Sequence, residues 1–295
     1  MTRGDSWGFE AGDQVTPELG VVQRLGGGAS CEAYLAFDEV THGPVVVKLL
    51  RPGRVGDPHG ARALEREADA LRAVNHPVVV RLLRDGRYDA RPHLVLEAAD
   101  GPRLSSLLRR HGPLQPEQYL PLGIDLASAA AYLRHVGHVH LDVKPGNVVM
   151  GAPARLIDLS AARPVAEAAA LRDVVGTDAY LAPEQCLPGR AGVPGHASDV
   201  WGIGVTLFEA AASRRPFDEG EPGADVGTAP ERVWPQLLQA PYDVPRTVAP
   251  AVADTLLACL AKQPEDRPTP AELSDALAPA YAALPKGRLA GFKVR

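Results

Sequence analysis

The stretch that decides the fold is His140-Leu141-Asp142-Val143-Lys144-Pro145-Gly146-Asn147. It carries a carboxylate, an amine and an amide within one short segment, and its Pro-Gly pair predicts an irregular loop. Asp142 can accept a proton or orient a hydroxyl group, Lys144 can neutralise a moving phosphoryl group, and Asn147 can bind a metal ion. Taken one at a time, these residues are also compatible with a solvated turn.

A second carboxylate, Asp158, follows at the end of a predicted strand. Asp158 ends the apolar run Leu156-Ile157, eleven residues beyond Asn147. A carboxylate at the end of a strand, downstream of an asparagine in a loop, is a plausible magnesium site.

Upstream, Lys48 lies inside the apolar run Val45–Leu50. Burying an unpaired lysine is unfavourable, so the side chain needs a partner or a ligand. The helix predicted for Ala61–Val74 offers Glu65 and Glu67 as partners. The alternative is a lysine on an edge strand that faces solvent.

A glycine-rich segment, Leu25-Gly26-Gly27-Gly28-Ala29-Ser30-Cys31, lies between two predicted strands. Glycines let backbone amides approach phosphate oxygens closely, although a tight hairpin turn needs glycines as well. No Gly-Lys-Ser/Thr follows, which excludes a Walker loop. A strand follows rather than a helix, which argues against a dinucleotide-binding fold.

Hydrophobic periodicity predicts an α+β molecule with two lobes and a ligand site in the cleft between them. The strands are predicted at Leu19–Leu25, Glu32–Phe37, Val45–Leu50, Val79–Leu83 and His93–Glu97. After Asp100-Gly101, helices are predicted at Leu104–Arg110, Pro116–Val136, Val200–Ala212, Pro230–Leu238, Ala251–Leu260 and Pro270–Tyr281. The acidic segment Asp218–Ala229 is predicted to be an exposed loop.

Composition narrows the class of protein. The 295 residues are 45% hydrophobic, with a net charge of -5 that gives no reason to expect nucleic acid or an acidic membrane as partner. Cys31, Cys186 and Cys259 are scattered and odd in number, which favours a reducing cytoplasm over a disulfide framework or zinc site. No signal peptide and no run of apolar residues long enough to span a membrane is visible.

These segments together resemble the signature set of protein kinases, in order and with suitable spacing. His140–Asn147 resembles the catalytic loop HRDxKxxN, and Asp158-Leu159-Ser160 resembles DFG. The remaining matches are Gly176–Glu184 to GTxxYxAPE, Asp199–Gly204 to DxWxxG, and Arg267-Pro268-Thr269 to the segment with the late arginine. The resemblance covers Leu19–Tyr281 and is nearest to bacterial Hanks-type (eukaryotic-like) serine/threonine kinases of actinobacterial character.

The resemblance implies a small antiparallel N-lobe with one main helix, and a larger, mostly helical C-lobe. It places the N-lobe at residues 16–97, the hinge at 97–100 and the C-lobe at 101–285, with an N-terminal extension (1–15) and a basic tail (286–295). The chain is then either a free-standing kinase or part of a longer membrane receptor kinase.

The resemblance also implies roles for residues, with ATP and Mg²⁺, or else Mn²⁺, as cofactors. Asp142 orients the substrate hydroxyl as base, assisted by Lys144, while Lys48 pairs with Glu67 and holds the ATP phosphates. Asn147 and Asp158 hold the metal. The ATP site further includes Leu25, Gly26, Gly28, Val46, Leu96 as gatekeeper, the hinge Glu97–Ala99, and Val149. The substrate platform and its supports comprise Thr177, Glu184, Asp199 and Arg267.

Lys144 and Thr177 are typical of kinases that act on serine and threonine, so protein substrates of that class are expected. Two other classes stay open: a pseudokinase that serves as a nucleotide-binding or scaffold module, and a kinase-fold phosphotransferase for small molecules. Ala182-Pro183-Glu184 and Arg267 argue against the latter, because they serve protein substrates.

Four departures from the family pattern stand out. Cys31 replaces the third glycine of the loop, Leu159 and Ser160 replace the last two residues of DFG, and Leu141 replaces the arginine that pairs with a phosphate on the activation loop. Between Leu159 and Pro183, the hydroxyl residues are Ser160, Thr177 and Tyr180, all at motif positions. The hypothesis is that phosphorylation of this loop does not activate the protein.

Overall fold

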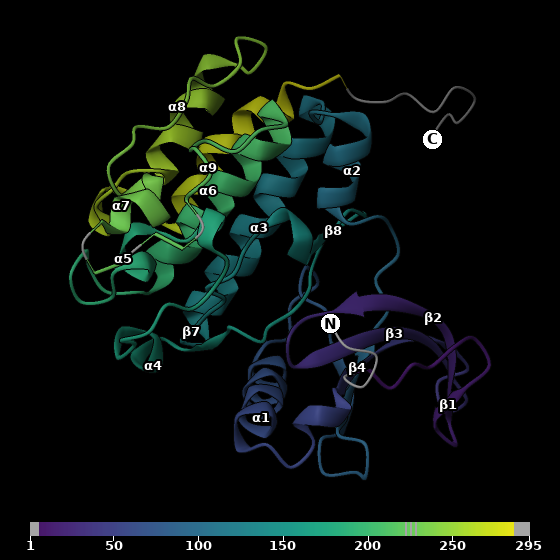
Figure 1. Ribbon diagram of the computed structural model, residues 1–295. Coiled ribbons are helices and arrows are strands. Elements are labelled where there is room, and N and C mark those ends of the chain that lie inside the picture. Colours follow the sequence, from purple (N-terminus) through teal and green to yellow (C-terminus); the bar gives the residue numbers. More distant parts are fainter. Residues whose placement is uncertain (1–5, 222, 225, 228, 286–295) are drawn as a thin grey trace, which may run out of the picture.

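The computed structural model describes residues 6–285, apart from residues 222, 225 and 228. A β-sheet with one long helix forms the first lobe, and a mostly helical lobe follows (Figure 1). The predicted α+β class with two lobes is confirmed. The basic tail predicted at residues 286–295 lies outside the described residues, as do the first five residues of the predicted N-terminal extension.

The N-lobe contains a six-stranded sheet in the order β1-β2-β3-β4-β6-β5. Every neighbouring pair in it is antiparallel. The strands are β1 (Gln14–Thr16), β2 (Leu19–Gly27), β3 (Cys31–Asp38), β4 (Gly43–Leu50), β5 (Leu82–Gly86) and β6 (His93–Glu97). The glycine-rich segment therefore joins β2 and β3 as a hairpin.

Strand β4 shows why a lysine tolerates an apolar strand. Its side chains alternate between the two faces of the sheet. Val45, Val47 and Leu49 belong to the buried cluster on the outer face. Val46 and Lys48 point to the opposite face, where they line the cleft between the lobes.

Helix α1 (Pro58–Ala73) packs its apolar stripe against the sheet. It begins before the predicted Ala61, because Asp57 caps it by accepting a hydrogen bond from His59 N and because Pro58 occupies the first helical position. Glu67 lies on the buried face of the helix and Glu65 is only half-buried. The rotation of α1 thus selects which glutamate faces the sheet.

The C-lobe is built from helices with short strands between them. The helices are α2 (Leu104–His111), α3 (Pro116–His135), α4 (Val165–Ala169), α5 (Pro183–Cys186), α6 (His196–Ala212), α7 (Pro230–Val233), α8 (Pro250–Cys259) and α9 (Pro270–Ala282). The short strands are β7 (His138–Val139), β8 (Val148–Val149), β9 (Arg155–Leu156) and β10 (Arg163–Pro164), with β7 paired to β10 and β8 to β9. Turns of 3₁₀ helix in this lobe lie at Pro145–Asn147, Asp178–Tyr180, Pro235–Leu237 and Pro264–Asp266, and another, Pro52–Arg54, follows β4 in the N-lobe. A helix with the length and apolar character to cross a membrane is not found in the described part of the chain.

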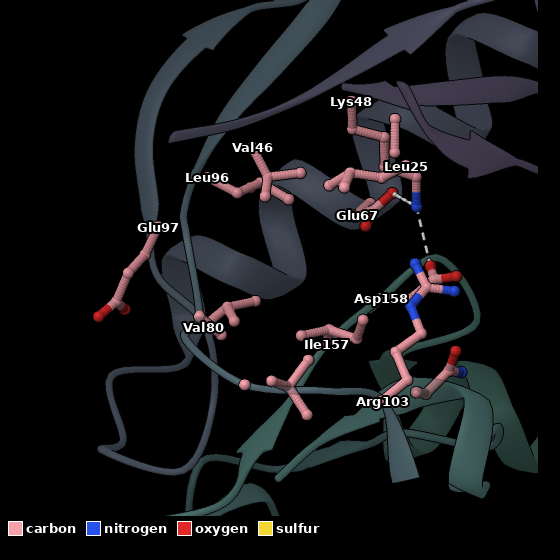
Figure 2. A pocket seen from close by; sticks show the side chains of 15 residues that line it. Leu25, Val46, Lys48, Glu67, Val80, Leu96, Glu97, Arg103, Ile157 and Asp158 are labelled. Atoms are coloured by element: carbon pink, nitrogen blue, oxygen red, sulfur yellow. Dashed lines mark hydrogen bonds and ion pairs between the residues drawn. The ribbon is translucent and has the colours of Figure 1, made fainter. Parts of the chain in front are cut away.

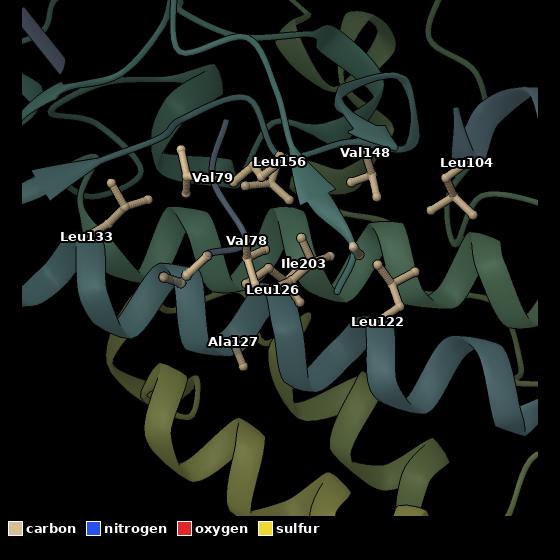
Figure 3. Close-up of a cluster of buried hydrophobic side chains, with 14 of the residues drawn as sticks. Val78, Val79, Leu104, Leu122, Leu126, Ala127, Leu133, Val148, Leu156 and Ile203 are labelled. Atoms are coloured by element: carbon tan, nitrogen blue, oxygen red, sulfur yellow. The ribbon is translucent and has the colours of Figure 1, made fainter. Parts of the chain in front are cut away.

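Helix α3 forms the centre of the C-lobe core. Figure 3 shows Leu126 of α3 close to Ile203 of α6 and Leu156 of β9, which belong to one buried cluster. A Cβ atom added at Gly123 would lie 2.7 Å from Leu277 Cδ1 and 3.0 Å from Leu207 Cδ1. Glycine at this position therefore lets α6 and α9 approach α3 closely.

Several predicted elements differ in their bounds from the observed ones; α6, for example, begins at His196 and not at the predicted Val200. The strand predicted at Val79–Leu83 begins only at Leu82, because Val79 and Val80 turn inward, and Val79 forms a bridge with Leu156. The helix predicted at Pro230–Leu238 is split into α7 and the 3₁₀ turn Pro235–Leu237. Pro235 lacks an N–H and disfavours helical geometry in the residue before it.

A buried carboxylate ties β3 to β5. Asp38 is fully buried, and both of its oxygens accept hydrogen bonds from Arg84, each at 2.7 Å. Val40 N and Thr41 Oγ1 donate to it as well. The hydrogen bonds from Arg84 hold the pKa of Asp38 well below its usual value, despite burial.

We predict that Arg84→Met lowers the unfolding free energy by roughly 3 kcal/mol at pH 7, because it leaves a buried carboxylate without its cation. Because the pKa of Asp38 is lower in the folded protein than the value of 3.8 expected for the unfolded chain, the ionised carboxylate stabilises the folded state above that pH. This stabilisation is lost as the pH falls through the folded-state pKa. The difference between native protein and variant should therefore shrink below pH 4. Urea unfolding at pH 7 and pH 3 measures the unfolding free energies of the native protein and the variant, and Arg110→Met at an exposed position is the control. If Arg84→Met lowered the unfolding free energy equally at both pH values, the role given to Asp38 would be wrong.

Candidate active site

A cavity of about 260 Å³ lies in the cleft between the lobes. One part of its lining is apolar, and the other end carries charged and amide groups (Figure 2). The apolar lining comes from Leu25, Ala33, Val46, Val80, Leu96, Ala99, Val149 and Ile157. Lys48, Glu67, Asn147 and Asp158 line the polar end. Such a shape suits a flat apolar ring with a charged group attached.

The ammonium group of Lys48 joins three parts of the chain at the polar end. Its Nζ lies 2.6 Å from Glu67 Oε2 on α1 and 2.8 Å from Asp158 Oδ1, in the loop that follows β9 (Figure 2). Of the two glutamates considered from the sequence, Glu67 is thus the one that contacts the lysine. Burial opposes the charged form of Lys48, but the two carboxylates outweigh it and raise its pKa. The same lysine lowers the pKa of Asp158, again against the effect of burial.

The loop that follows β7 brings the other polar residues together. Lys144 Nζ lies 2.6 Å from Asp142 Oδ2, and Asn147 Nδ2 donates to the same oxygen at 3.0 Å. Thr177 Oγ1 donates to Asp142 Oδ1 at 2.7 Å and accepts a hydrogen bond from Lys144. Asp142, Lys144, Asn147 and Thr177 thus form one hydrogen-bonded group, although Thr177 lies 35 positions after Asp142.

The backbone of this loop is held by Asp199 at the start of α6. Asp199 is buried and accepts hydrogen bonds from His140 N and Leu141 N, both at 2.8 Å. Leu141 adopts a φ of 63°, which non-glycine residues rarely do. The two hydrogen bonds that the buried carboxylate accepts hold the backbone in this conformation.

A second cavity of about 400 Å³ adjoins the first. Asp142, Asp158, Lys48 and the loop residues Gly28 and Ser30 all line it. Gly26, which was predicted to cover a phosphate, lines neither cavity and has a φ of 134°. The two cavities together bring the Lys48 group and the Asp142 group to one site.

Two of the predicted platform residues, Glu184 and Arg267, form a buried ion pair. Arg267 donates to Glu184 through both Nη atoms, at 2.7 and 2.8 Å, and both side chains are buried. Ser198 Oγ also donates to Glu184. Gln185, which the sequence did not single out, donates to Leu141 O and Val175 O and so connects the Asp142 loop with the segment before Thr177.

The predicted hinge residue Glu97 directs its charge outward. Figure 2 shows its side chain pointing away from the cavity, and its carboxylate pairs with Arg81 and Arg155. The two arginines therefore neutralise the charge of Glu97 away from the cavity, and the lining near the hinge stays largely apolar.

The residues that depart from the family pattern are mostly buried. Leu159 is fully buried in the main core, and Leu141 packs with Val139 and Ala168 in a small apolar cluster. Ser160 N donates to Asp158 Oδ1 at 3.3 Å. Cys31 is buried at the start of β3, where burial raises the pKa of its thiol to about 11.

The residues fit a magnesium ion held together with phosphate groups. Asn147 uses its Nδ2 for the Asp142 loop, and its amide oxygen accepts no hydrogen bond within residues 6–285 as described. No cluster of three or more His, Cys, Asp or Glu side chains that could hold a metal occurs in that part of the chain. Mg²⁺ is commonly held by one or two protein groups plus substrate phosphates, which agrees with this sparse set.

Sequence reasoning missed several residues of the cavity, most notably Arg103. This residue precedes α2, lines the cavity and has no ion-pair partner among the described residues (Figure 2). Ala33, Val80, Gly101 and Ile157 were also missed. Alternation along the strand could have found Ala33, because Ala33 pairs with Lys48 across β3 and β4.

The comparisons with known proteins agree with one another. The family model described as "Protein kinase domain" matches residues 19–277. The chain is 31% identical over 263 residues to serine/threonine-protein kinase PknB of Mycobacterium leprae, covering 85% of this chain and 40% of the relative. It is 28% identical over 219 residues to serine/threonine-protein kinase PrkC of Bacillus subtilis, covering 73% and 33%. A probable serine/threonine-protein kinase of Streptomyces coelicolor is 31% identical over 264 residues, covering 85% and 37%. The chain thus matches 33–40% of the length of these relatives.

Proposed function

The chain belongs to the protein kinase family, and we propose that it transfers the γ-phosphate of ATP to serine and threonine side chains of other proteins. The observation that carries the proposal is the convergence of two groups on adjoining cavities. Lys48, Glu67 and Asp158 form the first group, and Asp142 with Lys144 belongs to the second. Phosphoryl transfer needs chiefly positioning and charge neutralisation, and these groups offer both.

Each group has a task in this proposal. Adenine enters the apolar part of the cavity between Val46 and Val149, and Lys48 contacts the phosphates. Mg²⁺ held by Asn147 and Asp158 supplies neutralisation of phosphate charge, and Mn²⁺ is the alternative ion. Asp142 accepts or orients the proton of the substrate hydroxyl, and Lys144 stands beside it to balance charge.

The pseudokinase alternative finds no support in the comparisons, because the similar proteins are named as serine/threonine-protein kinases. The bound pair Glu184–Arg267 favours a protein as substrate over a small molecule, as the resemblance implied. A cytoplasmic location stays a prediction from the cysteine pattern, and all three cysteines are free and buried.

We predict that Asp142→Asn lowers the transfer rate about 10²–10⁴-fold, the range for removal of a general base. The assay uses labelled ATP, magnesium and a generic substrate such as myelin basic protein, with Asp254→Asn on the exposed face of α8 as control. Phosphoamino-acid analysis of the labelled substrate should show phosphoserine or phosphothreonine. Transfer by the Asp142→Asn variant at the native rate, or phosphotyrosine as the main product, would refute the corresponding part of the proposal.

Arg103 should act on the phosphates rather than on adenine. Figure 2 shows its side chain pointing along the mouth of the cavity toward Asp158. A hydrogen bond to a charged group contributes about 1.5–3 kcal/mol, so Arg103→Gln should weaken ADP binding about tenfold or more. Adenosine binding should not change, and calorimetry with both ligands measures the two effects. Arg110→Gln, at an exposed position of α2, is the control. An equal loss for adenosine and ADP would contradict the assignment.

Contacts of the segment 159–183, which corresponds to the activation loop of the family pattern, support the hypothesis that its phosphorylation is not needed. Leu141 is buried where the family arginine would pair with a phosphate, and Leu171 and Val165 pack against the same apolar cluster. Thr177 Oγ1 is already engaged by Asp142 and Lys144. Apolar contacts and these hydrogen bonds therefore order the segment without a phosphate.

We accordingly predict that protein treated with phosphatase keeps its transfer rate toward the generic substrate. Mass spectrometry before and after treatment identifies the phosphorylated residues, and untreated protein is the control. If Thr177 proved to be phosphorylated and activity were lost when this phosphate is removed, the hypothesis that phosphorylation of this segment is not needed would be wrong.

A further inference from the structure

A buried ion pair lies directly behind the glycine-rich loop. Glu32, the second residue of β3, is fully buried, and Arg51, just after β4, is 2% exposed. Arg51 Nη1 lies 3.0 Å from Glu32 Oε1. Neither residue belongs to the groups that line the two cavities. Burial of two charges is unfavourable unless their geometry and hydrogen bonds are good, so the pair calls for an explanation.

Arg51 ties the loop down at two points. Its Nε donates to Gly28 O at 2.8 Å, and its backbone N donates to Ser30 O at 2.9 Å. Within the loop, Gly28 N donates to Cys31 O at 3.0 Å. Because Arg51 follows β4, the strand that carries Lys48, these bonds fix the loop relative to the lysine.

The close approach of the backbone of β3 explains the middle glycine, and Arg51 lies next to the same point. A Cβ atom added at Gly27 would lie 2.6 Å from Cys31 O and 3.3 Å from Arg51 Nη2. Glycine has the largest backbone entropy to lose on ordering, so a run of glycines needs external contacts to stay in one conformation. Arg51 supplies such contacts from outside the loop.

Glu32 keeps Arg51 in place and is itself fully hydrogen-bonded. Tyr34 Oη donates to it at 2.7 Å, Trp7 N at 3.2 Å and Arg24 Nη2 at 3.3 Å. Burial disfavours the charged form, but hydrogen bonds from Ser6, Tyr34 and Trp7 outweigh it and lower the pKa of Glu32. The carboxylate therefore stays charged opposite Arg51.

The same carboxylate anchors the segment Ser6–Phe9 to the N-lobe. Trp7 Nε1 donates to Leu50 O at 2.8 Å, next to Arg51 in the chain. Trp7 stacks on Phe9 with 6.0 Å between ring centroids, and Arg91 lies over both rings. This segment, which lines neither cavity, thus contacts Glu32, the residue that holds Arg51 in place.

We propose that Glu32 and Arg51 are positioning residues for the glycine-rich loop, and that the segment Ser6–Phe9 completes their support. In this role they hold Gly28 and Ser30 over the end of the site where the phosphates of ATP would lie, without touching the nucleotide. The inference rests on the proposed nucleotide site and concerns the phosphate part of it alone.

The test compares Arg51→Met with Arg24→Met in the full chain. Both arginines pair with Glu32, but Arg24 is half exposed and, among the residues that the structure describes, donates to no carbonyl of the loop. Arg51→Met removes the side-chain hydrogen bond to Gly28 O and keeps the backbone hydrogen bond to Ser30 O. It should weaken ADP binding about tenfold, the effect of losing about one hydrogen bond, while adenosine binding stays unchanged. Under steady-state conditions the KM for ATP should rise more than kcat falls. Arg24→Met should resemble the native protein in both measurements.

A second measurement keeps the inference falsifiable without any nucleotide. Amide hydrogen exchange of residues 26–31 in the unliganded protein should be faster in Arg51→Met and unchanged in Arg24→Met. If Arg51→Met fails to fold, Glu32→Gln and Trp7→Ala should accelerate the same amides. Unchanged exchange in these variants, or equal loss of adenosine and ADP binding, would overturn the inference. Absence of phosphoryl transfer by a protein that shows these shifts would instead count against the proposed function alone.

Discussion

The buried ammonium group of Lys48 is the constraint on which the rest of the structure depends. An unpaired lysine inside an apolar strand is unfavourable, and this one is paired with Glu67 at 2.6 Å and Asp158 at 2.8 Å. The three residues come from β4, α1 and the loop after β9, so a single charge fixes a strand, a helix and the other lobe. The polarity of this end of the cleft follows from these contacts.

Buried charges organise the C-lobe in the same manner. Asp199 stabilises a left-handed residue in the loop of Asp142, and Arg267 neutralises Glu184 beneath it. Gln185 connects that loop to the segment before Thr177 through two carbonyl groups. None of these supports faces the cavities, yet each determines where a reacting group can stand.

Two departures from the family pattern are accompanied by different contacts: an apolar cluster surrounds Leu141, and a buried ion pair lies behind the glycine-rich loop. Leu141 lies in an apolar cluster at the position where the family pattern has an arginine. Behind the glycine-rich loop, which lacks its third glycine, Arg51 binds two backbone carbonyls and is held by the buried Glu32. Arg51 thereby connects the loop to the end of the strand that carries Lys48.

The sequence alone determined the lobes, most strands and helices, and the order of the chemical groups along the chain. These features depend on local periodicity and on near neighbours, which a single segment contains. The tertiary structure decided which glutamate faces Lys48, that Arg103 enters the cavity, and that Arg51 reaches Gly28. It also decided where β5 begins, because burial of Val79 against Leu156 took precedence over strand propensity. Such pairings depend on the rotation and packing of elements distant in sequence, and no local pattern encodes them.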